Sequence, residues 1–73
     1  IEWVTMPAQG GVTGSTIGDV AIRARSGASV VAVIRDGGSI LGPGSDFRFA
    51  GRDVVLLMGA ADGVAAAATL LVG

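Results

Sequence analysis

The sequence predicts a small α+β fold in which one mostly antiparallel sheet packs against two helices. Two runs rich in β-branched residues, 28–35 and 53–58, have the length and composition of strands that are buried on both faces of a sheet. Two other segments, 17–25 and 63–71, place apolar residues at helical spacing. With two further short strands, the element order is β-α-β-β-β-α, which is typical of a two-layer sandwich. We expect residues 1–73 to form a single domain.

The first strand and the first helix are separated by a proline and a glycine-rich loop. Residues 2–6 are expected to form an edge strand that ends at Pro7, because proline cannot donate a hydrogen bond to a sheet. Thr16 is a favourable N-cap, and Asp19 follows at the spacing of a capping box. Gly27 is suited to the left-handed C-cap that would end this helix.

A tight hairpin is expected to follow the first buried strand. Asp36-Gly37-Gly38 tolerates positive φ angles, so it favours a short turn into a strand at 39–41. The run Gly42-Pro43-Gly44-Ser45 then breaks that strand. Phe47 and Phe49 are expected to share one face of a further short segment before the second buried strand.

Size and composition together predict a homodimer. A domain of 73 residues buries little apolar surface, and this one has neither cysteine nor histidine for disulfides or common metal sites. No apolar run approaches the roughly 20 residues that span a bilayer, so we expect a cytoplasmic domain without membrane insertion. The near-neutral net charge argues against binding to polymeric nucleic acid. Because the chain begins at Ile1, we expect it to be part of a longer protein.

The acidic residues are expected to have structural roles, and we do not expect an enzyme or a cofactor. Without histidine and cysteine, the usual nucleophile–base pairs cannot form. Asp36 falls in a turn, Asp19 and Asp62 are placed to cap helices, and Asp53 begins a strand. An ion sensor built on Asp19, Asp36 or Asp46 is a less supported alternative, because these carboxylates are scattered along the chain.

The end of the first helix and the start of the next strand form a candidate ligand site. All basic residues are arginine, whose planar guanidinium binds phosphate through two parallel hydrogen bonds. If the loop containing Pro43 lies beside the helix end, Arg23 would sit at the mouth of an apolar slot. The apolar residues of that slot would be Ile17, Ile22, Val30 and Pro43. Such a slot suits an aromatic base attached to a phosphate. The alternative is that the aliphatic residues are core and Arg23 is a solvated helix cap.

Three segments resemble the RCK_C domain, also called the TrkA C-terminal domain. They are IGDVAIRARSGASVVAVIRDG at 17–37, ILGPGSDF at 40–47 and DVVLLMG at 53–59. The resemblance extends from Trp3 to Leu71. The lead-in Trp3-Val4-Thr5-Met6-Pro7 is most similar to detached regulatory subunits of cation–proton antiporters.

The resemblance implies a cytoplasmic, dimeric regulatory domain that acts on a membrane cation–proton antiporter. Several RCK_C domains bind cyclic di-AMP at the dimer interface, with the adenines on an apolar patch and the phosphates near an arginine and backbone amides. Matched to this sequence, the patch falls on Ile17, Ile22, Val30 and Pro43, and the polar contacts on Arg23, Ala24 (through its backbone), Ser29 and Gly42. A ligand-free dimerisation scaffold for a cation transporter is the alternative.

Some positions depart from the family pattern. Ser29 stands where nucleotide-binding members often have asparagine, and Gly42 offers no side chain. Ser45 replaces a common second proline, at a position expected to lie away from the patch. Arg35 is expected to lie in the hairpin outside the site, so that its replacement should affect ligand binding little.

Overall fold

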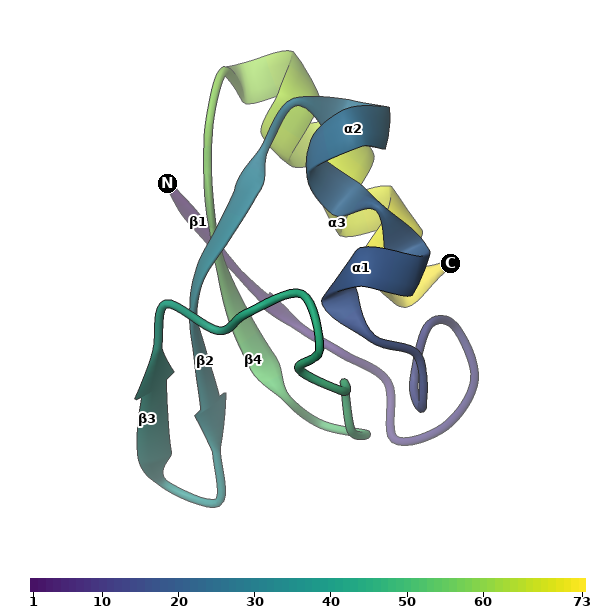
Figure 1. Ribbon diagram of the computed structural model, residues 1–73, viewed down its shortest axis with the longest axis vertical. Coiled ribbons are helices and arrows are strands. Elements are labelled where there is room, and N and C mark those ends of the chain that lie inside the picture. Colours follow the sequence, from purple (N-terminus) through teal and green to yellow (C-terminus); the bar gives the residue numbers. More distant parts are fainter.

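In the computed structural model, four strands form one sheet and three helices lie on one side of it (Figure 1). The structure describes all residues, 1–73. The strands are β1 (Glu2–Thr5), β2 (Ser29–Arg35), β3 (Gly38–Leu41) and β4 (Val54–Met58), and the helices are α1 (Ile17–Val20), α2 (Ile22–Ser26) and α3 (Ala61–Val72). The sheet order is β1-β4-β2-β3, with every pair antiparallel. The predicted α+β class and antiparallel sheet are therefore confirmed.

The two central strands are β2 and β4, as their β-branched composition predicts. Val33 and Val55 pair with each other on the side that faces the helices, and both are fully buried. On the other side, Ile34 and Leu56 remain partly exposed. The expectation that these strands are buried on both faces is wrong, because no element of the chain covers the second face of the sheet.

The β2–β3 hairpin has the predicted tight turn. Asp36 and Gly37 both have positive φ, at 53° and 79°, and Arg35 pairs directly with Gly38. Two consecutive residues with positive φ form the turn type whose twist matches that of the flanking strands. The turn therefore fixes the register of β3, which is an edge strand like β1.

The single helix predicted over 17–25 is wrong, because the chain breaks at Ala21 into α1 and α2. Ala21 adopts the left-handed conformation with φ 54° and ψ 46°. Residues two positions apart lie on opposite sides of a continuous helix, yet Val20 and Ile22 are both buried. The break thus places two apolar side chains in the core. The predicted caps are present: Asp19 N–H donates to Thr16 Oγ1 at 3.0 Å, and Gly27 ends α2 with φ 82°.

The phenylalanine segment pairs with the entrance to α1 and not with the sheet. Backbone hydrogen bonds of 2.8–2.9 Å join 14–18 to 45–49, through Gly14 N–H to Phe49 O, Phe49 N–H to Ser15 O, Ile17 N–H to Phe47 O and Gly18 N–H to Ser45 O. The two phenylalanine rings contact each other edge to face, with centroids 5.9 Å apart. This pairing supplies carbonyl acceptors for the first amides of α1, which a helix cannot satisfy internally.

Helix α3 packs on β1, β4 and α2 through a stripe of small and apolar residues. Its buried residues are Gly63, Val64, Ala67 and Leu71. The prediction that Asp62 caps this helix is wrong: the N-cap is Ala60, and Asp62 lies within the first turn. None of the three helices has the length and apolar character required to cross a membrane.

Candidate ligand-binding site

A cavity of about 330 Å³ opens between the broken helix, the start of β2 and the loop after β3. It is lined by Ile17, Ile22, Arg23, Ala28, Ser29, Val30 and Ser45. Its volume is near the lower end of the roughly 300–1,000 Å³ that small-molecule sites occupy. The lining combines aliphatic side chains, two hydroxyl groups and one guanidinium.

The cavity has an apolar floor and a polar rim. Ile22 and Ala28 are 1% and 0% exposed, so they form the floor and present little surface themselves. Ile17 and Val30 are partly buried and form the walls. Arg23 is exposed at the rim. This arrangement can hold a flat apolar group inside and an anionic group at the opening.

Arg23 is the one arginine that lines the cavity, and its side chain has no partner within the chain. Three other arginines donate hydrogen bonds: Arg25 to Val20 O, Arg48 to Gly14 O, and Arg35 to several acceptors. Arg52 also lacks a partner, but it does not line the cavity. The Arg23 guanidinium is therefore available to an anion without first breaking an internal contact.

The break at Ala21 positions this arginine. It turns Ile22 into the core and leaves the next residue, Arg23, at the surface. Ser26 then ties the end of α2 to the start of β2, because its hydroxyl donates to Ile22 O at 2.6 Å and accepts from Ala28 N–H at 3.1 Å. The helix end and the strand that line the cavity are thus held together by one side chain.

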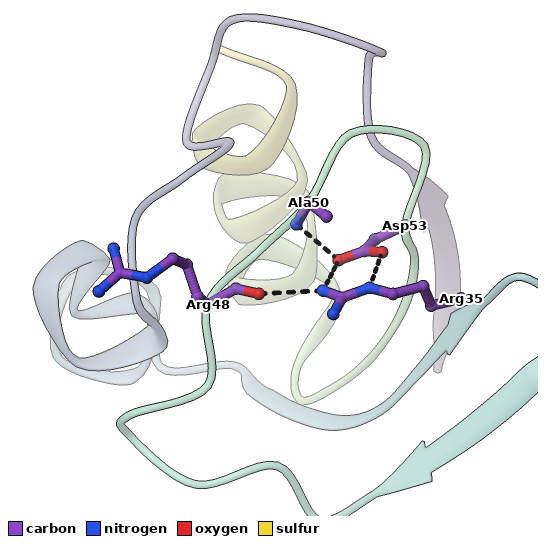
Figure 2. Close-up of polar contacts among 4 residues, drawn as sticks. All are labelled: Arg35, Arg48, Ala50 and Asp53. Carbon is purple, nitrogen blue, oxygen red and sulfur yellow. Dashed lines mark hydrogen bonds and ion pairs between the residues drawn. The ribbon is translucent and has the colours of Figure 1, made fainter.

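A second polar cluster holds the later part of the β3–β4 connection, which follows the cavity residue Ser45 in the sequence (Figure 2). The Arg35 guanidinium donates to both carboxylate oxygens of Asp53, at 2.9 and 2.8 Å, and to Arg48 O at 2.9 Å. Ala50 N–H donates to Asp53 Oδ2 at 2.9 Å. The same guanidinium lies 4.9 Å from the ring centre of Phe47, within range of a cation–π contact. Arg35 and Asp53 therefore fasten the 47–53 loop to β2.

The charge state of this pair follows from its contacts. Burial of Asp53 favours the neutral acid, but hydrogen bonds from Arg35 and from Ala50 N–H outweigh burial and hold the pKa of Asp53 below its ordinary value. The hydrogen bond to Asp53 raises the pKa of Arg35. Both groups are consequently charged at neutral pH. Arg35 is thus a structural residue, and because it does not line the cavity, the expectation that its replacement affects ligand binding little stays a prediction.

The structure brings most of the predicted ligand-binding residues to one place. Ile17, Ile22, Arg23, Ser29 and Val30 all line the cavity. Ala24 is exposed on the next position of α2, and α2 has no side-chain N-cap, so no side chain accepts from its first amides.

Gly42 and Pro43 do not line the cavity; they lie in the loop that leads to it. Gly42 N–H donates to Val31 O at 3.0 Å, which anchors the loop at the edge of β2. Sequence reasoning missed Ala28 and Ser45. The expectation that Ser45 lies away from the patch is wrong, because Gly18 N–H donates to Ser45 O and so brings this residue to the rim.

The structure gathers no group of three acidic residues that could hold a metal ion. Asp19, Asp36 and Asp46 belong to α1, the β2–β3 turn and the loop after β3, respectively. The ion-sensor alternative therefore has no structural support.

Comparison with known proteins identifies the family. Residues 1–72 match the TrkA-C domain. The chain belongs to the TrkA-C domain family. TrkA-C domains, also called RCK_C domains, are regulatory and non-enzymatic, so this domain is a regulatory module. No curated protein sequence matches the chain.

Solved structures share the fold of this TrkA-C domain at low sequence identity. The RCK_C domain dimer of S. agalactiae BusR in complex with c-di-AMP is 23% identical with a TM-score of 0.86, and the match covers 96% of this chain and 92% of that one. The RCK C domain of the potassium transport protein KtrA in complex with c-di-AMP is 22% identical with a TM-score of 0.79, covering 93% and 80%. The match also covers 34% of the BusR chain in a complex with its promoter DNA. This TrkA-C domain therefore spans about a third of that longer protein.

Proposed function

We propose that this TrkA-C domain is a cytoplasmic regulatory domain of a potassium or other cation–proton antiporter and that it senses cyclic di-AMP between two copies of itself. The observation that carries the proposal is the unpartnered Arg23 at the rim of a cavity with an apolar floor. A dimerisation scaffold would not require an arginine in that position.

Each part of the ligand has a chemical counterpart in the cavity. An adenine ring is flat and largely apolar on its faces, so it would pack against Ile17, Ile22 and Val30. The phosphate would accept hydrogen bonds from Arg23 and from the backbone amide of Ala24. Ser29 would contribute a hydroxyl at the strand end.

The size of the cavity supports a site shared by two chains. About 330 Å³ suits one base better than a whole dinucleotide. Cyclic di-AMP is itself two-fold symmetric, so each half would meet the same residues of a different chain. Gly42 and Pro43 precede the part of the loop at the rim, and a ligand that projects from the cavity would reach them.

Two similar structures support the choice of ligand. The BusR domain was solved as a dimer with c-di-AMP, and the KtrA domain was also solved with that nucleotide. The antiporter context comes from the resemblance of residues 3–7 to antiporter regulatory subunits. This resemblance is the feature that favours a regulator of an antiporter over a regulator of a channel or an uptake system.

Calorimetric titration of the purified chain with cyclic di-AMP tests this function. We expect saturable heat with one ligand for every two chains. Linear di-AMP should bind less tightly, because the ring of the cyclic form holds both bases in place before contact. Absence of heat at high micromolar ligand would refute ligand sensing and leave the scaffold function in its place.

A further inference from the structure

The side of the sheet that faces away from the helices is an uncharged apolar surface. The strand register aligns Trp3, Leu56, Ala32 and Leu41 in one row across all four strands. The adjoining row on this side begins at Thr5 and ends at Ser39, and it also contains no charged residue. We name this surface, the two rows together with Met58, the open sheet face.

The open sheet face exposes large apolar side chains. Trp3 is 51% exposed, Leu41 80% and Met58 47%. At roughly 200 Å² for a large side chain, these three leave on the order of 350 Å² of apolar surface in water. The largest apolar patch on a typical monomer is roughly 300–600 Å² and is often functional. All three helices lie on the other side of the sheet, and the side chains of this patch remain exposed (Figure 1).

The area and the charge of this face indicate its occupant. A standard stable interface buries about 800 Å² on each partner. The three side chains supply nearly half of that area. The partly exposed Leu56 lies between Trp3 and Leu41, and Ile34 and Val54 adjoin it in the next row. In a two-fold contact, the same surface of each copy meets its counterpart. A charged residue near the axis would therefore face the same charge on the other copy and weaken the contact. A face without charge meets this requirement, and two sheets can pack face to face about 10 Å apart.

We propose that the open sheet face is a self-association surface, on which a second copy of this chain packs with its own open sheet face. This contact does not require cyclic di-AMP. The cavity proposed to bind that ligand lies on the helix side of the sheet, between α2, β2 and the loop after β3. If the ligand also joins two chains at the cavity, the two kinds of contact together would link four chains.

The single tryptophan provides a local probe of this contact. Trp3 is the only tryptophan in the chain and lies on the open sheet face. In a dilution series of the ligand-free chain, we expect sedimentation to show a dimer at tens of micromolar and a monomer at low concentration. The Trp3 emission should shift to longer wavelength over the same concentration range as the mass decreases.

A matched pair of arginine substitutions tests the surface itself. Leu41→Arg places an unpaired charge in the contact and should weaken association at least tenfold, while the 80% exposure of Leu41 means that the fold is retained. Ala66→Arg adds the same charge on the exposed side of α3 and should leave association unchanged. Circular dichroism of each variant establishes that it is folded.

Two results would overturn the proposal. One is a ligand-free chain that stays monomeric at 100 µM with Trp3 exposed throughout, which would assign the face to a different protein. The other is a folded Leu41→Arg variant that associates like the parent. Binding of cyclic di-AMP to Leu41→Arg is measured separately, and this variant should bind the ligand like the parent. A folded Leu41→Arg variant that no longer binds cyclic di-AMP would show that the open sheet face and the cavity are not independent.

Discussion

Replacing Arg35 with alanine tests whether the pair with Asp53 holds the 47–53 loop against β2. The substitution removes three hydrogen bonds, two to the Asp53 carboxylate and one to Arg48 O. The side chain of Asp53 is 0% exposed, so its charge would remain buried with only Ala50 N–H as a donor. The charge on Asp53 is therefore the source of the expected destabilisation.

The size of the expected destabilisation follows from the burial of Arg35 and Asp53. Removing one member of a buried ion pair destabilises a protein by about 3–5 kcal/mol. The Arg35 side chain is 34% exposed, so water can enter the space it leaves, and we expect the lower end, about 3 kcal/mol. Such a loss corresponds to a decrease of roughly 12–24 °C in Tm for a domain of this size.

Denaturant and thermal unfolding of three variants provide the assay. Asp53→Asn leaves behind an arginine that can reach water, so it should destabilise less, by about 1–2 kcal/mol. The double variant Arg35→Ala/Asp53→Asn should be more stable than Arg35→Ala alone, because the buried charge is gone. An Arg35→Ala variant within about 0.5 kcal/mol of the parent would show that the pair with Asp53 does not stabilise the fold. A double variant that is no more stable than Arg35→Ala would show that the buried charge of Asp53 is not the source of the destabilisation.

Two further predictions concern stability. The pKa of Asp53 is lowered in the folded state, so the stability it contributes is present above the ordinary aspartate pKa of about 3.9 and is lost as the pH falls through the folded value. In acid titrations of unfolding, the stability difference between the parent and Asp53→Asn should therefore narrow below about pH 4; a constant difference would contradict this. Gly63→Ala should destabilise by about 1–3 kcal/mol, because the added Cβ would lie 2.7 Å from Ser26 O, although alanine is the better helix former. A Gly63→Ala variant as stable as the parent in thermal unfolding would show that α3 shifts freely against α2.

Sequence patterns predicted the sheet well because its signals are local. The β-branched runs at 28–35 and 53–58 became the central strands, and Asp36-Gly37 formed the predicted turn. Each of these features depends on the conformational preferences of a few neighbouring residues. The caps at Thr16 and Gly27 were predictable for the same reason.

The break in the first helix could not be predicted from local preference. Alanine favours helix and disfavours the left-handed conformation by roughly 1–2 kcal/mol, so Ala21 carries no sign of a break. Burial of both Val20 and Ile22 favours the break, and that burial depends on packing against the sheet and α3. A pattern of apolar residues two apart within a helical segment is the one available signal.

Some residues of the candidate site could likewise be predicted from the sequence, and others could not. Ile17, Ile22, Arg23, Ser29 and Val30 come from two adjacent segments, and the family resemblance placed them together. Ser45 reaches the rim through long-range backbone pairing with α1, which its own neighbours do not encode. The role of Arg35 was missed because its partner, Asp53, lies 18 positions away in the sequence.

Calorimetric titration of cyclic di-AMP onto two arginine variants tests whether Arg23 binds the ligand. Arg23→Ala removes the unpartnered guanidinium at the cavity rim, and a charge-assisted hydrogen bond from such a group contributes roughly 1.5–3 kcal/mol. The affinity for cyclic di-AMP should therefore decrease by roughly tenfold to more than a hundredfold for each guanidinium removed. Arg52→Gln removes the other unpartnered arginine, which does not line the cavity, and should bind like the parent. Equal affinity of the parent and Arg23→Ala would show that Arg23 does not contact the ligand.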